Sequence, residues 1–413
     1  MHDNDLIIIG AGAAGMMAAL TAANAGQQVL LLEKMDQPGR KLRITGKGRC
    51  NLTNTAPLKE FLTHIGSDSR FLRNSFSQFF NEDLITFFEE HGVPLVEERG
   101  SRIFPKSGKS LDIFLALIQE IERSPRITIQ KNTSVKELIL NEDGICRGVV
   151  LADGTRLRAP KVIVATGGKS YPLTGSTGDG YTLALQAGHT VVEPVPSLVG
   201  LVCEEPIPEE LENFTLKNVS LRISLPDGKK VGEFFGEMNF TDNGIGGPIV
   251  LSASRLSSRL LHSGQPLKAE IDLKPAIERE QLDKRLIKDL DANGNRLFHD
   301  ALRLWLPAEL VNLCLQRTKI EKFKRLNQIN AADRKKLLNF LKAVTFTLTA
   351  TRGFEEAIVT QGGVSLKEVN PKTMESRLVP GLFFAGEILD LDADTGGYNL
   401  QIAFSTAVAA GKP

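Results

Sequence analysis

The chain has 413 residues, of which 42% are hydrophobic and 24% charged, and its formal net charge at neutral pH is +1. These values are those of an ordinary globular protein with room for two or three domains, and the charge excludes a surface that is basic throughout and attracts nucleic acid or anionic membrane as a whole. Four well-separated cysteines, Cys50, Cys146, Cys203 and Cys314, form no C-x-x-C pair, so the sequence shows neither a redox-active dithiol nor a zinc cluster. We expect a reducing compartment, the cytoplasm, and chemistry that depends on a bound cofactor and on no metal.

The first predicted elements are a strand, a tight turn, a helix and a second strand within Asp5–Lys34. The apolar run Leu6–Ile9 predicts the first strand, the alanine-rich stretch before Gly26 has the composition of a helix that ends at a glycine, and Val29–Leu32 predicts the second strand. Between the first strand and the helix lies a G-x-G-x-x-G motif, made of Gly10, Gly12, Ala13, Ala14 and Gly15.

This glycine spacing predicts a dinucleotide site. The first glycine allows the tight turn, the second lets the backbone approach a pyrophosphate, and the third lets helix and strand pack closely, while the helix N-terminus offers unpaired N–H groups to phosphates. Glu33, followed by Lys34, ends the second strand, where a carboxylate can accept hydrogen bonds from the ribose hydroxyls of an adenosine. Because both strands, the helix and the acid are in register, we assign these residues to dinucleotide binding in preference to a purely structural glycine turn.

The same stretch has an alternative interpretation as a membrane span. Residues 6–32 carry no charge, and about 20 apolar residues suffice for a transmembrane helix. Polar residues interrupt the run, however, and it is preceded by Asp3 and Asp5, where a secretory signal would have basic residues. We therefore expect a cytoplasmic protein that does not enter a membrane.

The next segment, Gly39–Asn54, is dense in glycine and cationic residues. Its glycines let the backbone come close to a ligand, and its arginines and lysines can neutralise a diphosphate. A solvated basic loop is the alternative, but such a loop has no need for so many small residues beside the charges.

The sequence of this segment, GRKLRITGKGRCNLTN, resembles GRKLLISGGGRCNVTN, the signature of the aminoacetone-oxidase-like, BaiN-like family of FAD-dependent oxidoreductases. In that family the loop wraps the cofactor. The resemblance implies that the FAD site is lined here by Arg40, Lys41, Thr45, Gly46, Gly48, Arg49, Cys50 and Asn51. Thr45 keeps the hydroxyl of the more usual serine, whereas Lys47 replaces a small residue.

Helices and strands alternate up to the middle of the chain. A phenylalanine-rich stretch, residues 58–92, has the spacing of helices that bury one face, so we interpret its rings as core rather than as a flavin-stacking box. Arg102–Ser107 resembles the family segment R-V-F-P-x-S, and its sequence predicts a turn before a helix at Leu111–Ile121. Strands are predicted at Ile127–Ile129 and Val135–Leu140, and by resemblance Val135 lies where this flavoprotein class holds the adenine edge through backbone atoms.

A hairpin at Gly148–Leu157 leads into the apolar strand Lys161–Ala165 and then into a short glycine turn. A strand that ends in A-T-G-G downstream of a first βαβ unit is typical of flavoproteins with two dinucleotide-binding folds, and it favours FAD over NAD. The predicted cofactor residues here are Ala165, Thr166 and Gly167. The glycine-rich residues 174–180 precede a helix that is predicted to run to Ala187. These residues either form part of the ligand site or make a turn that contacts no ligand.

From about residue 191 the pattern changes to prolines and alternating strands. Residues 219–225 alternate apolar and polar side chains, which predicts an antiparallel sheet with one face in water. Phe240–Pro248 resembles the family loop F-T-H-x-G-x-S-G-P, with Asp242 in place of histidine and Gly246 in place of serine. If those side chains shape substrate selection, the substrate of this protein differs from that of its relatives.

Residues 276–343 are predicted to be mostly helical and carry a basic stretch. A positive helical face could meet RNA or an acidic partner. We favour a solvated face, because Glu321 and Asp333 lie among the cations and no interleaved aromatic residue indicates a nucleic-acid platform. No nucleic-acid partner is therefore expected.

The last third returns to strands and ends in an alanine-rich helix. Ala357–Val364, Gly381–Asp390 and Thr395–Gln401 resemble the family segments V-T-x-G-G-V, G-L-x-F-A-G-E-x-L-D and T-G-G-Y-N-L-Q. An acidic residue, glycines and a helix N-terminus fit the ribityl hydroxyls and the flavin ring, and the helix end can stabilise an anionic reduced ring. The predicted cofactor residues here are Gly386, Glu387, Gly396, Gly397, Tyr398, Asn399 and Leu400.

Together these observations predict an α/β fold: a Rossmann-like FAD domain of the glutathione-reductase type with an inserted cap. The expected ranges are 1–190 with 351–413 for the FAD domain, 191–275 with about 344–350 for a β-rich insertion, and 276–343 for a helical insertion.

The expected function is hydride transfer between flavin and a small organic substrate, either an amine or a molecule with an activated C–H bond or an enone. No second G-x-G-x-x-G unit is visible, so the redox partner is O2 or a transiently docked NAD(P)H. An RNA-modifying flavoprotein and a flavin-bound sensor without turnover are the alternatives. Tyr171 and His189 are isolated polar candidates, and no catalytic base is assigned.

Overall fold

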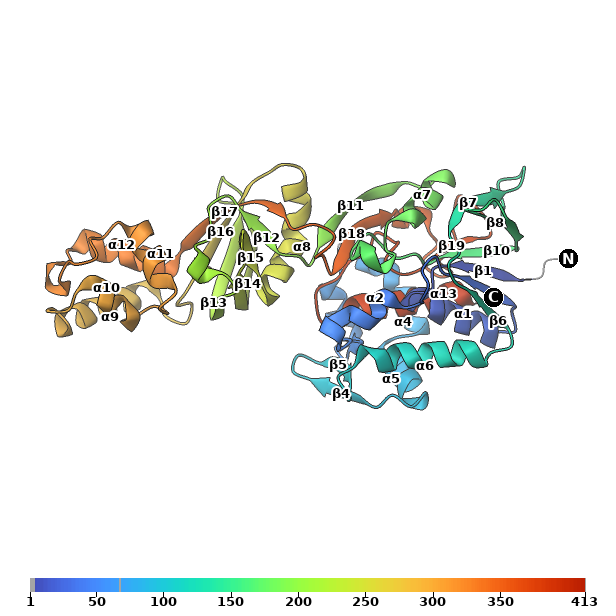
Figure 1. Ribbon diagram of the computed structural model, residues 1–413, viewed down its shortest axis with the longest axis horizontal. Helices are drawn as coiled ribbons and strands as arrows, with labels where there is room; N and C mark the ends of the chain where they lie inside the picture. The colour runs from blue at the N-terminus through green and yellow to red at the C-terminus, as the bar shows by residue number, and fades with distance from the viewer. Residues whose placement is uncertain (1–3, 67, 413) are drawn as a thin grey trace. The chain divides into compact units, whose positions relative to one another are not determined.

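The computed structural model describes residues 4–66 and 68–412, so Asp3 lies outside the described residues. The chain forms two compact units, Met1–Ser197 with Phe354–Pro413, and Leu198–Gly353 (Figure 1), and each unit has a hydrophobic cluster of its own. The second unit contains the range expected for the helical insertion and most of the range expected for the β-rich one, but residues 191–197 lie in the first unit. Within the described part of the chain, no helix combines the length and the apolar character needed to cross a bilayer.

The first unit is built on a five-stranded sheet in which every neighbouring pair of strands is parallel. In spatial order the strands are β19 (Leu382–Phe384), β10 (Lys161–Val164), β1 (Leu6–Ile9), β2 (Val29–Leu32) and β6 (Ile127–Gln130). The central strand β1 is buried along its whole length, which explains its uninterrupted apolar sequence. Because the strands run the same way, their carboxyl ends meet at one edge, where α/β folds bind ligands. The predicted Rossmann-type fold is confirmed.

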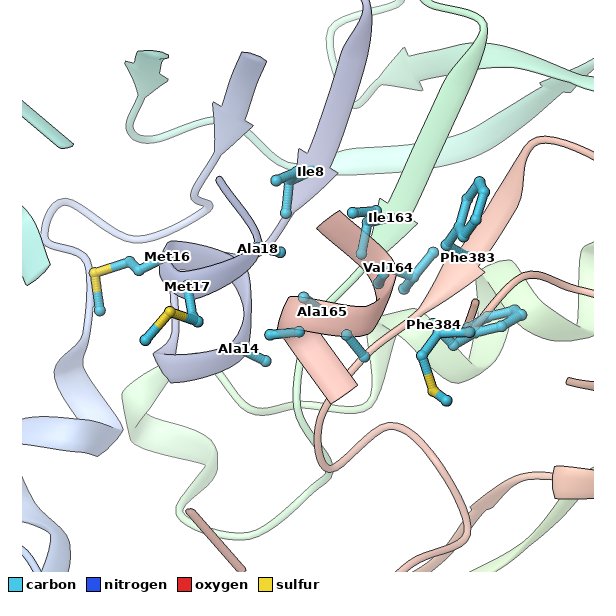
Figure 2. Close-up of a cluster of buried hydrophobic side chains, with 14 of the residues drawn as sticks. Ile8, Ala14, Met16, Met17, Ala18, Ile163, Val164, Ala165, Phe383 and Phe384 are labelled. Carbon is cyan, nitrogen blue, oxygen red and sulfur yellow. The ribbon is translucent and has the colours of Figure 1, made fainter. Parts of the chain in front are cut away.

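Two helices, α1 (Ala13–Asn24) and α13 (Tyr398–Gly411), pack together through small residues. A Cβ on Gly411 would lie only 2.7 Å from the carbonyl oxygen of Ala18, so the two helix backbones approach closely. Figure 2 shows the core at this place, where side chains of α1 lie beside the strands of the parallel sheet. The labelled residues are Ala14, Met16, Met17 and Ala18 of α1, with Ile8, Ile163, Val164, Ala165, Phe383 and Phe384.

Helices and small sheets surround this core. The remaining helices of the first unit are α2 (Arg40–Ile44), α3 (Leu58–Phe61), α4 (Arg73–Gln78), α5 (Asn81–Glu90), α6 (Ser110–Arg123) and α7 (Asp179–Gln186). The remaining strands are β3 (Thr53–Asn54), β4 (Leu95–Glu98), β5 (Arg102–Pro105), β7 (Val135–Leu140), β8 (Cys146–Leu151), β9 (Arg156–Arg158), β11 (Val191–Ser197) and β18 (Val359–Val364). The turn predicted within Arg102–Ser107 is confirmed only for its last two residues, Lys106 and Ser107, because Arg102–Pro105 form β5, which pairs with β3 and β4.

The phenylalanine-rich stretch is core, as predicted. Phe61 is fully buried and makes edge contacts with the rings of Phe76, Phe80 and Tyr398, with centroid distances of 5.4, 5.0 and 4.7 Å. Edge-to-face pairs at these distances stabilise a packed cluster beyond the area they bury. These rings therefore fix the start of α13 against α3 and α4.

The second unit contains a closed barrel, where the sequence predicted only an antiparallel sheet. The barrel order is β12 (Leu201–Cys203), β15 (Gly244–Gly246), β14 (Lys230–Phe240), β13 (Thr215–Ser224), β16 (Leu267–Asp272) and β17 (Val344–Thr351). The predicted alternation on β13 is observed, with Val219, Leu221 and Ile223 buried. The helices of this unit are α8 (Pro248–His262), α9 (Arg279–Ala292), α10 (Phe298–Ala301), α11 (Leu310–Thr318) and α12 (Ala331–Lys342).

Candidate active site

The G-x-G-x-x-G turn joins the carboxyl end of β1 to the N-terminus of α1. Gly10 has a φ of +98°, and a Cβ on it would lie 2.7 Å from the carbonyl oxygen of Ala165. A Cβ on Gly15 would overlap the carbonyl oxygen of Gly10, whereas a Cβ on Gly12 would meet no atom of the described protein within 4 Å. The first and third glycines therefore serve the turn and the packing, and the second borders open space beside the uncapped helix N-terminus.

Glu33 is fixed at the carboxyl end of β2 by two backbone groups. Its Oε2 accepts a hydrogen bond from the N–H of Ala11, and its Oε1 accepts one from the N–H of Met35, both at 2.9 Å. The N–H of Thr133 donates to the carbonyl oxygen of Glu33 at 2.8 Å, which brings the start of β7, with Val135, close to this carboxylate. A carboxylate oxygen has a second lone pair, so each can still accept from a ribose hydroxyl.

A second glycine-rich turn lies beside Lys34. The ammonium of Lys34 donates to the hydroxyl of Thr177 and pairs with Asp179 at 2.6 Å, and a Cβ on Gly175 would lie 2.8 Å from the side chain of Met35. Burial raises the pKa of Asp179, but the hydrogen bonds from Lys34 and Thr177 outweigh it and hold that pKa below its ordinary value. Lys34 thus ties residues 174–180 to the end of β2.

The Gly39–Asn51 loop returns to the N-terminus of α1, where the N–H of Gly39 donates to the carbonyl oxygen of Ala11 at 2.9 Å. The loop then turns sharply after α2, and the carbonyl oxygen of Thr45 accepts from the N–H of Cys50 at 3.1 Å. Residues with positive φ in the loop are Gly39, Gly46, Lys47, Gly48 and Cys50. The motif glycines therefore serve a left-handed turn, and Lys47 adopts the same conformation without being glycine.

The two arginines of this loop have protein partners. Arg40 lies 3.8 Å from Asp36 on the surface. Arg49 pairs with Glu98, and its guanidinium lies 4.5 Å from the centroid of the Phe104 ring. The structure thus directs Arg49 toward the β4–β5 hairpin, although the sequence analysis assigned it to a diphosphate.

One thiol and two side-chain oxygens near the glycine turns are buried. Burial raises the pKa of the Cys50 thiol to about 12, so the thiol stays protonated and is not a nucleophile. Asn51 Oδ1 and Thr166 Oγ1 are buried, and neither has a hydrogen-bond partner among the described residues. Buried oxygens of this kind are rare unless a ligand or water satisfies them, and the space at Gly48 is open in the same way as that at Gly12.

Glu387 is the centre of a network that joins four distant segments. Its Oε2 pairs with Lys41 Nζ at 2.7 Å, and its Oε1 accepts from the hydroxyl of Ser170 at 3.0 Å and from the N–H of Thr360 at 2.8 Å. Lys41 also donates to Ser170 Oγ at 2.6 Å. Gly386, at a φ of +81°, makes the turn that presents Glu387. Each group in this partly buried network has a charged or polar partner, so the network fixes the relative position of the four segments.

Backbone contacts at glycines also connect the last segment to the loop after residue 51. A Cβ on Gly397 would overlap the backbone of Thr53, and the carbonyl oxygen of Gly396 accepts from the side chain of Asn54 at 3.1 Å. The hydroxyl of Thr53 donates to Gln401 Oε1 at 2.6 Å. The N-terminus of α13, which begins after Gly397, is thereby held against β3.

Asn399 shapes the loop that precedes α13. Its Oδ1 accepts from the N–H of Ala393 at 3.0 Å, and its Nδ2 donates to the carbonyl oxygens of Ala393 and Asp394 at 2.9 and 3.2 Å. Leu400 packs against the core of the first unit. The side chain of Asn399 therefore serves the loop conformation.

A histidine that the sequence analysis missed lies beside the start of α13. The ring of His64 stacks on Tyr398 with centroids 4.4 Å apart and an angle of 16°. His64 Nδ1 lies 3.0 Å from Asp394 Oδ2. Burial, followed by Asp394 and Glu60, raises the pKa of Tyr398 to about 12, so its hydroxyl stays neutral. No local pattern marks His64, because its partners follow it by more than 300 residues.

His189 and Tyr171, the two isolated polar candidates of the sequence analysis, both form hydrogen bonds within the first unit. His189 is buried, with Nδ1 3.2 Å from Glu368 Oε2 and Nε2 2.8 Å from the hydroxyl of Ser376. Burial lowers the pKa of His189, against the opposing effect of Glu368. Tyr171 has a left-handed φ of +53°, and its N–H donates to the carbonyl oxygen of Phe354 at 2.9 Å.

The departures in the Phe240–Pro248 loop lie in the second unit. Asp242 pairs with Arg352 at 2.6 Å, and this hydrogen bond lowers the pKa of the carboxyl group. Gly246 is buried in β15, where a Cβ would lie 3.4 Å from the methyl group of Thr241, so a small side chain fits there with little adjustment. The Asp242 carboxylate thus has an arginine partner within its own unit.

The arrangement fits FAD on three observations. Open space borders Gly12 and Gly48, two buried oxygens on Asn51 and Thr166 lack partners among the described residues, and the Glu33 carboxylate is presented at the carboxyl edge of the sheet. The predicted segments at the head, middle and tail of the chain are joined by the contacts described above.

Comparisons with known proteins agree with this geometry. A family model described as "HI0933-like protein Rossmann domain" matches residues 4–413. A 3-dehydro-bile acid delta(4,6)-reductase of Clostridium scindens is 35% identical over 99% of this chain and 98% of its own length. A ribosomal RNA dihydrouridine synthase of Escherichia coli is 32% identical over 99% of this chain and 97% of its own length. Among solved structures, the Mycobacterium smegmatis Sdh1 complex in the apo form has a chain with a TM-score of 0.51 and 18% identity, covering 99% of this chain and 67% of that one, which supports the fold alone.

Two glycine substitutions should separate the two tasks of the motif. Gly12 has an extended conformation that valine accepts, with φ of −82° and ψ of −168°, so Gly12→Val should leave the melting temperature of the FAD-free protein unchanged and weaken FAD binding by about tenfold or more, about 1.4 kcal/mol. Gly15→Ala should instead destabilise the protein by about 2 kcal/mol or more, because the new methyl group would overlap a backbone oxygen. Calorimetry and FAD titration measure both effects, and a Gly12→Val protein that binds FAD normally would contradict the assignment.

The His189 cluster predicts a pH dependence of stability. Because its pKa is lowered in the folded protein, the unfolded chain binds more protons below the ordinary histidine pKa of about 6.5. The free energy of unfolding should therefore fall as pH drops below that value and level off below the folded pKa. Denaturant melts between about pH 5 and 7.5 measure this slope, and His189→Gln should flatten it. Equal slopes for both proteins would show that another group is responsible.

Proposed function

The chain belongs to the HI0933-like Rossmann family and is an FAD-dependent oxidoreductase, and from this premise we propose that it reduces a carbon–carbon double bond conjugated to a carbonyl group. The observation that carries the proposal is the match, over nearly the whole chain, to two relatives whose names describe this kind of reduction. A delta(4,6)-reductase of a 3-dehydro-bile acid saturates double bonds conjugated to a ketone. A dihydrouridine synthase saturates the uracil double bond that is conjugated to a ring carbonyl.

The proposed reaction adds a hydride to the carbon β to the carbonyl and a proton to the α carbon. The reductant is a reduced nicotinamide nucleotide, which loses the hydride and leaves as NAD(P)+. Bound FAD supplies the redox chemistry, because its ring system accepts and releases hydride. A transient nicotinamide donor agrees with the presence of one G-x-G-x-x-G motif in the sequence.

The residues proposed to hold FAD lie on the first unit. The amides at the start of α1, next to Gly12, take the diphosphate, and Glu33 takes the adenosine ribose. Asn51 Oδ1 and Thr166 Oγ1, which are buried without partners among the described residues, accept from the cofactor. The N-terminus of α13 after Gly397 offers partial positive charge to the flavin end.

We assign the proton-transfer step to His64. Its Nδ1 is held by the Asp394 carboxylate at 3.0 Å, which fixes the ring and leaves Nε2 for the substrate. In its doubly protonated form the ring gives the Nε2 proton to the α carbon and keeps the Nδ1 proton on the side of Asp394. The ring stacks on Tyr398, the first residue of α13, so it lies next to the helix end proposed to meet the flavin. About one third of the His64 side chain is exposed, at 34%, which leaves the ring accessible.

A second candidate substrate is a uracil base within RNA. The name of the Escherichia coli relative supports it, as does the charge of residues 276–343, which contain 15 lysines and arginines against nine aspartates and glutamates. The small enone is supported by the name of the Clostridium scindens relative. Both substrates require the same bond changes.

Anaerobic stopped-flow mixing tests the proposed function. NADPH or NADH should bleach the flavin absorbance of the purified protein, and one class of acceptor should restore it faster than buffer does. The acceptors are a steroid-type dienone, cyclohexenone, uridine and ribosomal RNA free of dihydrouridine. O2 is tested as the alternative acceptor, and a primary amine as the alternative donor. Restoration by O2 alone, or bleaching by an amine instead of a nicotinamide, would contradict the proposal, and a flavin that no donor bleaches would point to a protein without turnover.

His64 variants should split the two halves of the reaction. His64→Gln should keep the FAD content, the flavin spectrum and the rate of reduction by NAD(P)H, and slow reoxidation by the enone by about 10²-fold, the usual value of a positioned acid. Asp394→Asn should also slow reoxidation by the enone, by a smaller factor. A matched control is His91→Gln, whose ring packs on Phe87 at 4.3 Å. An unchanged rate of flavin reoxidation by the enone in His64→Gln would contradict the assignment of proton transfer to His64.

A further inference from the structure

A basic surface with an exposed aromatic ring lies on the helical part of the second unit. It is made of two segments that run side by side, residues 296–299 and 322–326. The N–H of Phe298 donates to the carbonyl oxygen of Lys324 at 2.8 Å, and the N–H of Leu326 donates to the carbonyl oxygen of Arg296 at 3.0 Å. We call it the Phe323 surface, formed by Arg296, His299, Lys322, Phe323 and Arg325.

Phe323 is held outward by a fixed turn. Its side chain is 56% exposed, and its N–H donates to Glu321 Oε1 at 3.0 Å. The next residue, Lys324, points inward and pairs with the buried Asp333 at 2.6 Å. A single exposed phenylalanine is common in soluble proteins, so the importance of this one depends on its neighbours.

Those neighbours are cationic or aromatic. Lys322 Nζ lies 4.6 Å from the centroid of the Phe323 ring, and the His299 ring makes an edge contact with it at 5.9 Å. Arg325 is exposed and donates to the backbone of Asn295, which keeps its guanidinium at the surface. The sequence analysis found no aromatic residue interleaved with these cations and was wrong on this point, because Phe323 stands between two lysines.

The charge of this region is strongly asymmetric. Residues 276–343 have a net charge of +6, which leaves −5 for the rest of a chain of net charge +1. Several of their carboxylates are taken up by internal pairs, such as Asp333 with Lys324 and Asp283 with Arg334. The acids that face the Phe323 surface are Glu321, which caps the turn, and Asp300, which lies 3.1 Å from His299. The exposed cations outnumber these two acids.

We propose that the Phe323 surface contacts RNA, with a base stacked on the Phe323 ring and phosphates paired with Arg296, Lys322 and Arg325. This inference rests on the proposed function with RNA as the substrate. Single-stranded RNA is recognised by aromatic rings that stack on bases, next to cations that follow the backbone. An acidic protein segment would use the cations and gain little from the ring, so the combination favours RNA.

The test uses the full-length holoprotein and a labelled single-stranded RNA oligonucleotide, with binding measured by fluorescence anisotropy between about 50 and 300 mM salt. Lys322→Glu with Arg325→Glu should weaken binding by about tenfold or more and reduce the salt dependence. Phe323→Ala should weaken binding by about tenfold with an unchanged salt dependence. Phe235→Ala, an exposed ring on the barrel at 66%, and Lys217→Glu with Lys229→Glu should bind like the native protein.

Melting temperature, FAD content and the rate of flavin reduction by NAD(P)H should be the same in all variants, which shows that they are folded. The proposal is overturned if the native protein does not bind the oligonucleotide at low salt, or if the variants of the Phe323 surface bind as the controls do. It is also overturned if polyglutamate displaces the RNA while Phe323→Ala has no effect, since the surface then binds an acidic partner. RNA binding without reduction of any conjugated double bond would instead contradict the proposed function, but it would still support RNA binding by the Phe323 surface.

Discussion

The candidate site depends on backbone segments that approach more closely than any side chain permits. At Gly15 and Gly397 a Cβ would overlap the backbone of another segment, and at Gly386 it would lie 2.8 Å from the methyl group of Ala14. These contacts join β1 to α1, α13 to β3, and the tail of the chain to its head. Glycine is the residue that allows such contacts, since it has no Cβ. Glycines spread along the sequence therefore allow these segments to meet at one edge of the parallel sheet, where a ligand can bind.

The Glu387 network adds polar specificity to this steric condition. Lys41 and Glu387 are separated by 346 positions in the chain, yet they pair at 2.7 Å with Ser170 and Thr360 beside them. The glycine contacts allow the segments to meet, and the network selects one arrangement of them. Rigid segments of this kind hold a cofactor and its surroundings in a fixed geometry, which is what redox enzymes require of the protein.

Much of this was predictable from local sequence, and the remainder depended on tertiary pairing. The strand, turn and helix around Gly10, the buried alternation on β13 and the final alanine-rich helix follow from periodicity and composition. The closure of the barrel, the strand at Arg102–Pro105 and the pairing of His64 with Asp394 depend on partners far away in the sequence. Arg49 shows the same limit, because a basic residue in a loop gives no sign that it will stack on Phe104.

The interleaving of the two units has a consequence for biosynthesis. β1, β2, β6 and β10 emerge from the ribosome early, but β19 and α13 follow only after residues 198–353, which form a unit with its own hydrophobic cluster. Domains generally fold as they are made, in order from the N-terminus. The nascent head of this protein must therefore wait, with one edge of its sheet and one side of α1 uncovered, while the inserted unit folds. The carboxyl edge of the sheet is therefore complete only after the inserted unit has been synthesised, and until then apolar surface of the first unit stays exposed.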